Sequence, residues 1–480
     1  MNRQIKVLLT VFVIILVAII VNLSWVQIFG ANGIQGNGFN KRRLVQEYAI
    51  QRGDILTADG HQPMARSVDT GGEYRYQREY PLGPLFAPIT GYDSWKYGRT
   101  GLEQTFNDQL LGRDSSLTLR SLGNKLLGAS KKGNSIVTTI DSRIQRTATE
   151  SLGNKVGAVI AMDPKTGAVL SMVTNPTYDP NVAVPSPGKD AKANQAQWDA
   201  YNANPLRPLF DRSINGLYPP GSSFKVVTGA AALDQGVVTP DSPFDCTGRL
   251  VVNGYSVYDF NHEVHGNLTF AQAMVVSCNI TFAQVGLRLG APALVNYSQL
   301  FGFNNPLPFD LPTTVSHIQK ASTMSQVDLA TASFGQVQDL ATPLQMASVA
   351  ATVANGGQMM QPYLVDDVQD YNGKVIEQIQ PKQIRRVIDQ QTASTLTDIM
   401  VKVVTSGTGT AAQIDGVDVA GKTGTAELGK GEPDAWFICF APAQDPKVAV
   451  AVVVENGGEG GVTAAPIARN VLRTALKVQP

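Results

Sequence analysis

A long uncharged stretch near the N-terminus is the feature that most limits what this chain can fold into. Residues Val7 to Phe29 form a run of 23 residues without a charged side chain. As a helix this run would reach roughly 35 Å at about 1.5 Å per residue, enough to cross the hydrocarbon core of a bilayer. A core helix of this length would normally show a polar face. The sequence therefore predicts a transmembrane anchor over residues 7–29, preceded by a short tail over residues 1–6.

The same stretch could instead be a signal peptide that is removed by cleavage. The segment Trp25 to Ala31 offers no pair of small residues at the required spacing, and Phe29 stands where a small residue would be needed. We therefore favour an uncleaved anchor. Charge does not fix its orientation, because Arg3 and Lys6 precede the run while three basic residues at 41–43 follow it.

The rest of the chain is long enough for two or three folded domains. Of its 480 residues, 43% are apolar and only 16% are charged, which is typical of a protein with large buried cores. Basic and acidic residues both number 39, so no excess of positive charge indicates a nucleic-acid partner. The function must therefore come from a local site.

Cysteine and histidine give little support for a metal site. The three cysteines lack the paired spacing of a zinc site, although Cys246 and Cys278 could form one disulfide outside the membrane. His262 and His265, together with Asp259, could be read as metal ligands, but no second ligand pair accompanies them. We predict no metal and no cofactor, and the state of the two cysteines stays open.

The sequence pattern changes near residue 134. Residues 30–40 are rich in Gly and Asn, and residues 41–132 mix short apolar runs with Gly and Pro. We therefore predict a linker and a smaller, irregular, β-rich, non-catalytic domain over 30–133, then a large α+β domain over 134–480. Residues 175–204 are predicted to be a long loop. In the large domain, strand patterns cover residues 135–140, 157–162, 168–173, 435–440 and 448–455, and helical patterns cover residues 142–152, 223–233, 268–289, 326–332, 342–354, 391–405 and 464–476.

The first motif with chemical content is Ser222-Ser223-Phe224-Lys225. Pro and Gly before a helical pattern place Ser222 at a helix start, and a spacing of three puts Lys225 on the same face. A nucleophile and its base would then lie within reach of each other. The same spacing occurs by chance in Ser186-Pro187-Gly188-Lys189, but Pro and Gly would break the helix there.

Two further motifs follow in order along the chain. Ser277-Cys278-Asn279 lies 55 residues after Ser222, and Lys422-Thr423-Gly424-Thr425 begins 145 residues after Ser277. Each is weak alone, since Ser213-Ile214-Asn215 and Lys165-Thr166-Gly167 have the same form. We therefore base the functional prediction on the order of the three motifs along the chain.

Taken together, these segments resemble the class B penicillin-binding proteins, most closely the penicillin-binding protein A type. The resemblance covers nearly everything after the anchor and implies a transpeptidase fold, an antiparallel sheet flanked by helices. The stretch from Arg52 to Gly60 departs from the family pattern at Thr57 and Ala58, which leaves the detail of the first domain in doubt. The supporting segments are Gly101-Leu102-Glu103-Gln104, Tyr218-Pro219-Pro220-Gly221-Ser222, Val275-Val276-Ser277-Cys278-Asn279, Phe334-Gly335-Gln336 and Val419-Ala420-Gly421-Lys422-Thr423-Gly424-Thr425.

The resemblance also implies a role for each motif residue. Ser222 would form an acyl-enzyme with a cell-wall stem peptide, and Lys225 would accept its proton. Ser277 would relay a proton to the leaving amine, while Asn279 would hold Lys225 and the substrate. Lys422 with the Thr423 and Thr425 hydroxyls would bind the substrate carboxylate, and Gly424 is also assigned to substrate binding. The backbone N–H groups of Ser222 and Thr425 would stabilise the oxyanion.

The implied protein is a peptidoglycan D,D-transpeptidase that acts in growth or division and is inhibited covalently by β-lactams. It would be a single-pass protein of the bacterial cytoplasmic membrane, with its tail in the cytoplasm and its catalytic domain outside. Expected partners are peptidoglycan stem peptides, β-lactams and membrane proteins of a division or elongation complex. A D,D-carboxypeptidase or a β-lactam sensor on the same fold is the alternative.

A hypothesis of a different class comes from residues 416–423. They formally match a phosphate-binding loop, Gly-x-x-x-x-Gly-Lys-Thr, which should follow a strand and open a helix. The Gly-rich residues after Lys422 cannot begin a long helix, so nucleotide binding is not favoured.

Overall fold

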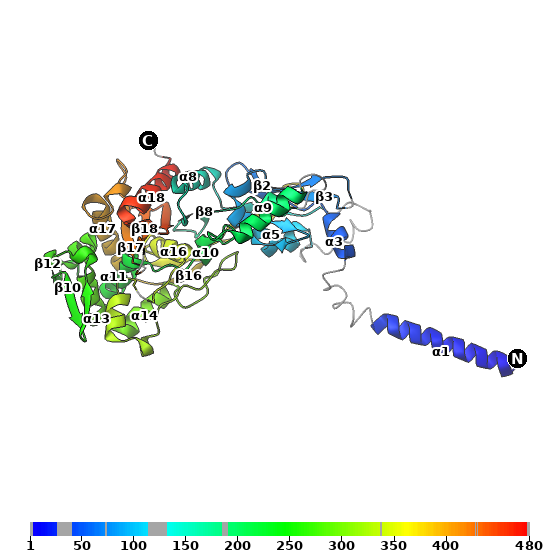
Figure 1. The fold of residues 1–480 in the computed structure, drawn as a ribbon, viewed down its shortest axis with the longest axis horizontal. Helices are drawn as coiled ribbons and strands as arrows, with labels where there is room; N and C mark the ends of the chain where they lie inside the picture. Colours follow the sequence, from blue (N-terminus) through cyan, green and yellow to red (C-terminus); the bar gives the residue numbers. More distant parts are fainter. Residues whose placement is uncertain are drawn as a thin grey trace.

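The computed structural model of the chain describes residues 3–25, 41–72, 74–113, 132–184, 191–336, 338–427, 429 and 431–477. Helix α1 (Arg3–Trp25) begins four residues before the predicted span, and residues 26–29 of that span lie outside the described residues. Its most apolar window has a mean hydropathy of 2.9 and is not buried against any other described part of the chain (Figure 1). The structure therefore contains a helix long and apolar enough to cross a membrane.

A five-stranded antiparallel sheet forms the centre of the large domain. Its strand order is β17-β18-β19-β7-β8, which places β17 at one edge. Val, Ile, Ala and aromatic residues fill β18 and β19, both of which are buried along their whole length, as expected of strands covered on both faces. The strands are β7 (Gly157–Met162), β8 (Val169–Asn175), β17 (Ala420–Ala426), β18 (Asp434–Ala441) and β19 (Val448–Val454).

Helices cover both faces of this sheet. The pair α8 (Ser142–Leu152) and α18 (Gly460–Leu476) packs on one face, where it closes one hydrophobic cluster (Figure 1). Helices α10 (Arg212–Asn215) and α16 (Pro343–Ala354) pack on the other face, and α17 (Gln390–Ser406) lies against β17. The predicted α+β fold, with an antiparallel sheet between helices, is therefore confirmed. Further helices of this domain are α11 (Lys225–Asp234), α12 (Phe270–Val276), α13 (Asn279–Leu289), α14 (Ala291–Leu300) and α15 (Gln326–Ala332).

A second sheet, of six strands, joins the first domain to the large one. Its order is β15-β14-β6-β1-β2-β3, so strands from both sides of residue 134 share it, and the boundary at 134 stays a prediction. Short helices and the hairpin of β4 (Asp93–Ser94) and β5 (Gly98–Arg99) complete the expected irregular, β-rich first domain. The other elements are α3 (Lys41–Tyr48), α4 (Ala87–Thr90), α5 (Gly101–Thr105), α6 (Asn107–Leu110), β1 (Ile55–Leu56), β2 (Pro63–Asp69), β3 (Tyr76–Glu79), β6 (Ser135–Thr138), β14 (Val365–Gln369) and β15 (Val375–Gln378).

Besides the β4–β5 hairpin, three small two-stranded sheets lie outside the two main ones. The hairpin β10–β11 and the pair β9–β12 occupy the end of the folded body opposite the first domain (Figure 1). They are built from β9 (Pro243–Cys246), β10 (Arg249–Val252), β11 (Tyr255–Tyr258) and β12 (Gly266–Thr269), and the third sheet pairs β13 (Gln358–Met360) with β16 (Gln383–Arg386).

Two expectations about single segments were wrong. The helical pattern at 268–289 is split into α12 and α13 at Ser277 and Cys278. The long loop expected at 175–204 contains α9 (Ala191–Ala203). This helix has a single buried residue, Trp198, whose ring stacks on Tyr97 at 4.5 Å. Its sequence shows no apolar stripe, because only one of its side chains is buried.

A buried ion cluster stabilises the first domain. Arg52 Nε and Arg78 Nε donate to opposite carboxylate oxygens of Glu103, at 2.7 Å and 2.5 Å. The Glu103 side chain is fully buried. Removing one member of such a cluster leaves its partners charged, buried and unpaired.

We expect Glu103→Gln to lower the free energy of unfolding by about 3–5 kcal/mol, because two buried guanidinium groups would lose the carboxylate charge that they share. The surface pair Arg66–Glu79, at 2.7 Å with side chains 49% and 42% exposed, offers a matched control. Glu79→Gln should change the free energy of unfolding little, because solvent screens an exposed ion pair. Urea unfolding followed by circular dichroism measures both variants, and equal losses would contradict the assignment.

Candidate active site

Ser222 lies in the 3-10 turn Gly221–Phe224, which runs directly into helix α11. Pro220 precedes the turn and Gly221 adopts a positive φ of 52°, so the local sequence favours a sharp entry into a helix. Lys225 follows one turn later as the first residue of α11 and is fully buried, whereas Ser222 is half-buried. The predicted placement of both residues at a helix start is confirmed.

The turn that carries Ser222 is held against the edge strand β17 and its neighbour β18. The indole Nε1 of Trp436 donates to the carbonyl oxygen of Pro219 at 2.9 Å. A side-chain carbon at Gly424 would lie 2.8 Å from the carbonyl oxygen of Pro220, so only glycine permits this approach. Gly424 thus brings the Lys422–Thr425 segment against the Ser222 turn.

Ser277 lies at the break between α12 and α13. It adopts a left-handed conformation with φ 65° and ψ 35°, which is unusual for a residue with a side chain and is often found at functional sites. Cys278 then caps α13, and Asn279 is the first residue of that helix. The break directs the backbone carbonyl and the side chain of Ser277, and the side chain of Asn279, toward Lys225.

The amine of Lys225 is surrounded by this second motif. Lys225 Nζ donates to the carbonyl oxygen of Ser277, to Ser277 Oγ at 3.1 Å and to Asn279 Oδ1 at 2.7 Å. Phe282 and Phe334 place their rings 5.4 Å and 6.0 Å from the same nitrogen. Three oxygen acceptors and an apolar wall therefore fix the amine at a single position.

The third motif meets the second at the Ser277 hydroxyl. Lys422 Nζ donates to Ser277 Oγ at 2.8 Å and to the carbonyl oxygen of Thr423 at 3.1 Å. The hydroxyls of Thr423 and Thr408 are 2.6 Å apart. Ser277 Oγ thus lies between two lysine nitrogens, and the structure brings the three motifs into one site.

Burial changes the protonation of both lysines. Loss of water lowers the pKa of Lys225 to about 7, although the charge of Asp259 opposes this change. Burial also lowers the pKa of Lys422 well below its ordinary value, and the nearby Lys225 charge adds to the effect. A neutral lysine amine, which can accept a proton, is therefore accessible near neutral pH.

Thr425 turns its backbone toward the Ser222 turn. Gln336 Nε2 donates to the Thr425 carbonyl oxygen at 3.5 Å, and a side-chain carbon at Gly221 would lie 2.8 Å from that oxygen. In an antiparallel strand the N–H and C=O of one residue point to the same side. The Thr425 N–H therefore also faces the Ser222 turn.

Two of the three segments that share a motif sequence lie elsewhere in the structure. Ser213 N and Oγ donate to Asp211, the N-cap of α10, at 2.9 Å and 2.5 Å. Lys165 lies in the β7–β8 turn, where it pairs with Asp445 at 2.5 Å. Residues 186–189 lie outside the described residues. The nucleotide-binding hypothesis is wrong, since Lys422 lies within strand β17 instead of at a helix start.

Sequence reasoning missed two residues of the site. Thr408, in the loop after α17, reaches Thr423, and Asp259, after β11, accepts a hydrogen bond from the Asn279 backbone N–H at 2.9 Å. Neither lies in a motif. Gly on both sides of Thr408 was a weak local signal, and the sequence around Asp259 pointed only to metal ligation.

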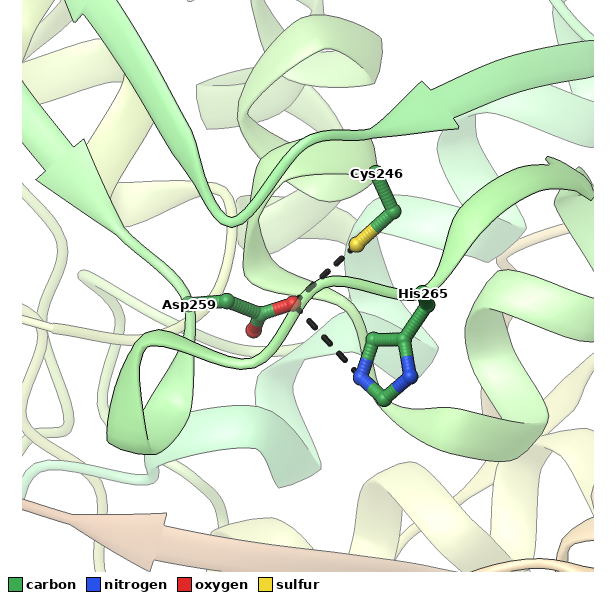
Figure 2. Close-up of side chains that lie close together, drawn as sticks. All are labelled: Cys246, Asp259 and His265. Carbon is green, nitrogen blue, oxygen red and sulfur yellow. Dashed lines mark hydrogen bonds and ion pairs between the residues drawn. The ribbon is translucent and has the colours of Figure 1, made fainter.

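The open question of the two cysteines is answered by a disulfide between Cys246 and Cys278. Among the described residues, Cys246, Asp259 and His265 place possible ligand atoms within 4.8 Å of one another (Figure 2). The Cys246 sulfur is bonded to Cys278, so this group offers no thiolate for a metal. His262, the other histidine of the metal reading, packs its ring against Tyr258 at 4.5 Å.

Comparison with known proteins places this geometry in a family. The profile of the penicillin binding protein transpeptidase domain matches residues 157–473, and that of the penicillin binding protein A dimerisation domain matches residues 52–136. The peptidoglycan D,D-transpeptidase PbpA of Mycolicibacterium smegmatis is 38% identical over an alignment of 498 positions, which covers 99% of each chain. PbpA of Mycobacterium tuberculosis is also 38% identical, over the full length of both chains.

Solved structures agree with the sequence relatives. The ceftriaxone acyl-enzyme of penicillin-binding protein A from M. tuberculosis has a TM-score of 0.85 and 37% identity, covering 90% of this chain and 100% of that one. Its imipenem acyl-enzyme has a TM-score of 0.84 and 38% identity at the same coverage. With this likeness in sequence and fold over nearly its whole length, the chain belongs to the class B penicillin-binding protein transpeptidases.

Proposed function

We propose that this chain is a peptidoglycan D,D-transpeptidase that uses Ser222 as its nucleophile. The observation that carries the proposal is the meeting of Lys225, Ser277 and Lys422 beside the Ser222 turn, through hydrogen bonds of 3.1 Å and 2.8 Å to one hydroxyl. Ser222 Oγ attacks the carbonyl carbon between two terminal D-alanines of a stem peptide. The amide bond breaks, the last D-alanine leaves as an amine, and an ester to Ser222 remains.

Lys225 is assigned as the general base of acylation. It lies one helical turn from Ser222, and burial holds the pKa of its amine at about 7, so it can be neutral when the hydroxyl proton must leave. Asn279 fixes the amine through its side-chain oxygen at 2.7 Å. Ser277 Oγ, which contacts both lysines, carries the proton onward to the leaving amine.

Lys422 and the β17 hydroxyls are assigned to the substrate carboxylate. Thr423 and Thr425 lie on the same strand, and Gly424 lets that strand approach the Ser222 turn. A carboxylate beside Lys422 would raise the pKa of this lysine and so favour its charged form. The N–H groups of Ser222 and Thr425 would then form the oxyanion hole, worth about 3–4 kcal/mol per donor in other enzymes.

β-Lactams combine a carboxylate with a strained amide, so the same contacts would direct them to Ser222. We expect mass spectrometry of the penicillin-treated chain to find the mass of one intact penicillin on the peptide that contains Ser222. The adduct should persist far longer than one round of cross-linking, because we assign no carboxylate among the described residues of the site to activate a deacylating water. An adduct on another residue would overturn the assignment, and rapid release of hydrolysed penicillin would indicate a β-lactamase.

Location and partners extend the proposal. Helix α1 would anchor the chain in the cytoplasmic membrane with its tail inside and its catalytic domain outside, where stem peptides are found. Because the first domain shows no catalytic constellation among its described residues, we assign it to contacts with membrane proteins of a division or elongation complex. A pull-down from detergent-solubilised membranes with the full chain as bait would test this assignment.

A further inference from the structure

Asp259 lies behind the Ser277–Asn279 motif and outside all three motifs. It follows strand β11, and its side chain is only 2% exposed. Figure 2 shows its carboxylate between Cys246 and His265, with Oδ2 at 3.1 Å from Cys246 Sγ and 3.8 Å from His265 Nε2. A carboxylate buried so deeply needs hydrogen-bond donors, and the identity of those donors indicates what it does.

The donors that Asp259 uses belong to the second motif and to its own loop. Oδ1 accepts from the Asn279 backbone N–H at 2.9 Å and from the Phe260 N–H at 3.0 Å. The first of these bonds fixes the start of α13, the helix that opens with Asn279. A negative charge is also favourable at that end of a helix.

The disulfide holds the same motif at its middle residue. Cys278 stands between Ser277 and Asn279, and its sulfur is bonded to Cys246 at the end of β9. The carboxylate and the disulfide therefore both reach the motif from residues 243–269. A shift of Asp259 or of β9 would move the oxygens that surround Lys225 Nζ.

We propose that Asp259 is a positioning residue, which together with the Cys246–Cys278 disulfide holds Ser277 and Asn279 against Lys225. The inference rests on the proposed acyl transfer at Ser222 and adds a residue that its motifs do not contain. Its test separates two contributions of the carboxylate, the hydrogen bond to Asn279 and the negative charge.

The charge of Asp259 acts on the lysine base. It raises the pKa of Lys225 against the larger effect of burial. The titratable groups that face these two residues are Lys422 on the Lys225 side, and His265, itself 3.3 Å from Glu263, on the Asp259 side. Removing the Asp259 charge alone therefore makes Lys225 lose its proton at lower pH.

Two substitutions at this position separate the contributions. Asp259→Asn keeps an oxygen that can accept from the Asn279 N–H and removes the charge, whereas Asp259→Ala removes both. Glu263→Gln removes a carboxylate from the same loop that is 54% exposed and serves as the matched control. The reaction is acylation of the full chain in detergent by a fluorescent penicillin, followed as a rate constant from pH 5 to 9. A rate constant of the labelled fraction is independent of how much of a variant is misfolded.

We expect the acid limb of the profile to move down by about one pH unit in Asp259→Asn, since an opposite charge nearby is worth about 1–3 units. Asp259→Ala should in addition slow acylation about 10²-fold at every pH, as misplacement of catalytic groups does. Glu263→Gln should match the wild type. An Asp259→Ala chain that acylates as fast as the wild type, a profile of Asp259→Asn that overlays the wild type, or an equal shift in Glu263→Gln overturns the inference. A wild-type chain that is not labelled at all overturns the proposed function instead.

Discussion

Replacing Ser222 with alanine is expected to abolish covalent labelling by a fluorescent penicillin while the chain stays folded. The hydroxyl is the atom that would form the ester, so no acyl-enzyme can form without it. The side chain is half-buried on a turn that is held by its backbone contacts with Gly335 and Trp436. Alanine fits that turn, and unfolding temperature should change little. Gel fluorescence after incubation to completion measures the loss.

Ser223→Ala is the matched control for this substitution. Ser223 is the next residue of the same turn and is fully buried, and its hydroxyl donates to the carbonyl oxygen of Pro220 at 2.6 Å. Removing it should cost about 1 kcal/mol of stability, the usual worth of one hydrogen bond, and leave labelling intact. If the Ser222→Ala chain were labelled as well as wild type, Ser222 would have no part in the reaction.

Periodicity of apolar residues was enough to predict most of the central sheet and its helices. The residues from Ser142 to Leu152 were predicted as a helix with the bounds that the structure shows, because Asp141 caps that helix and its buried positions repeat at helical spacing. The break at Ser277 was not predicted. Its left-handed conformation usually requires glycine, so a serine there gave no signal. Helix α9 was missed because its burial comes from one tryptophan.

The three motifs were predicted from their order in the chain, while the contacts between them were not. The spacing of three residues between Ser222 and Lys225 is enough to place them close together on one face of a helix. Ser277 Oγ contacts both Lys225 and Lys422. These contacts depend on how α12, α13 and β17 pack, and no local sequence pattern predicts that packing. The same holds for Asp259 and Thr408, whose partners lie 20 and 15 residues away.

Acylation by penicillin is expected to slow about tenfold for each pH unit below about 7, because the general base must be neutral. The pKa of Lys225 is lowered from its ordinary value to about 7 by burial, so the protonated, inactive form dominates below that pH and the neutral form above it. Lys225→Arg removes the neutral form of the base, since a guanidinium keeps its proton at every pH used. The variant should acylate about 10²–10⁴ times more slowly, the usual contribution of a general base.

Stopped-flow measurement of the acylation rate constant between pH 5 and 9 tests both statements. Lys165→Arg serves as the control, because Lys165 shares the Lys-Thr-Gly sequence but lies in an exposed turn, 50% accessible and paired with Asp445. It should leave the profile unchanged. A flat wild-type profile would mean that Lys225 is not the titrating base. A Lys225→Arg chain as fast as wild type would mean that the buried position needs only a positive charge, which would move the base to another group that faces Ser222.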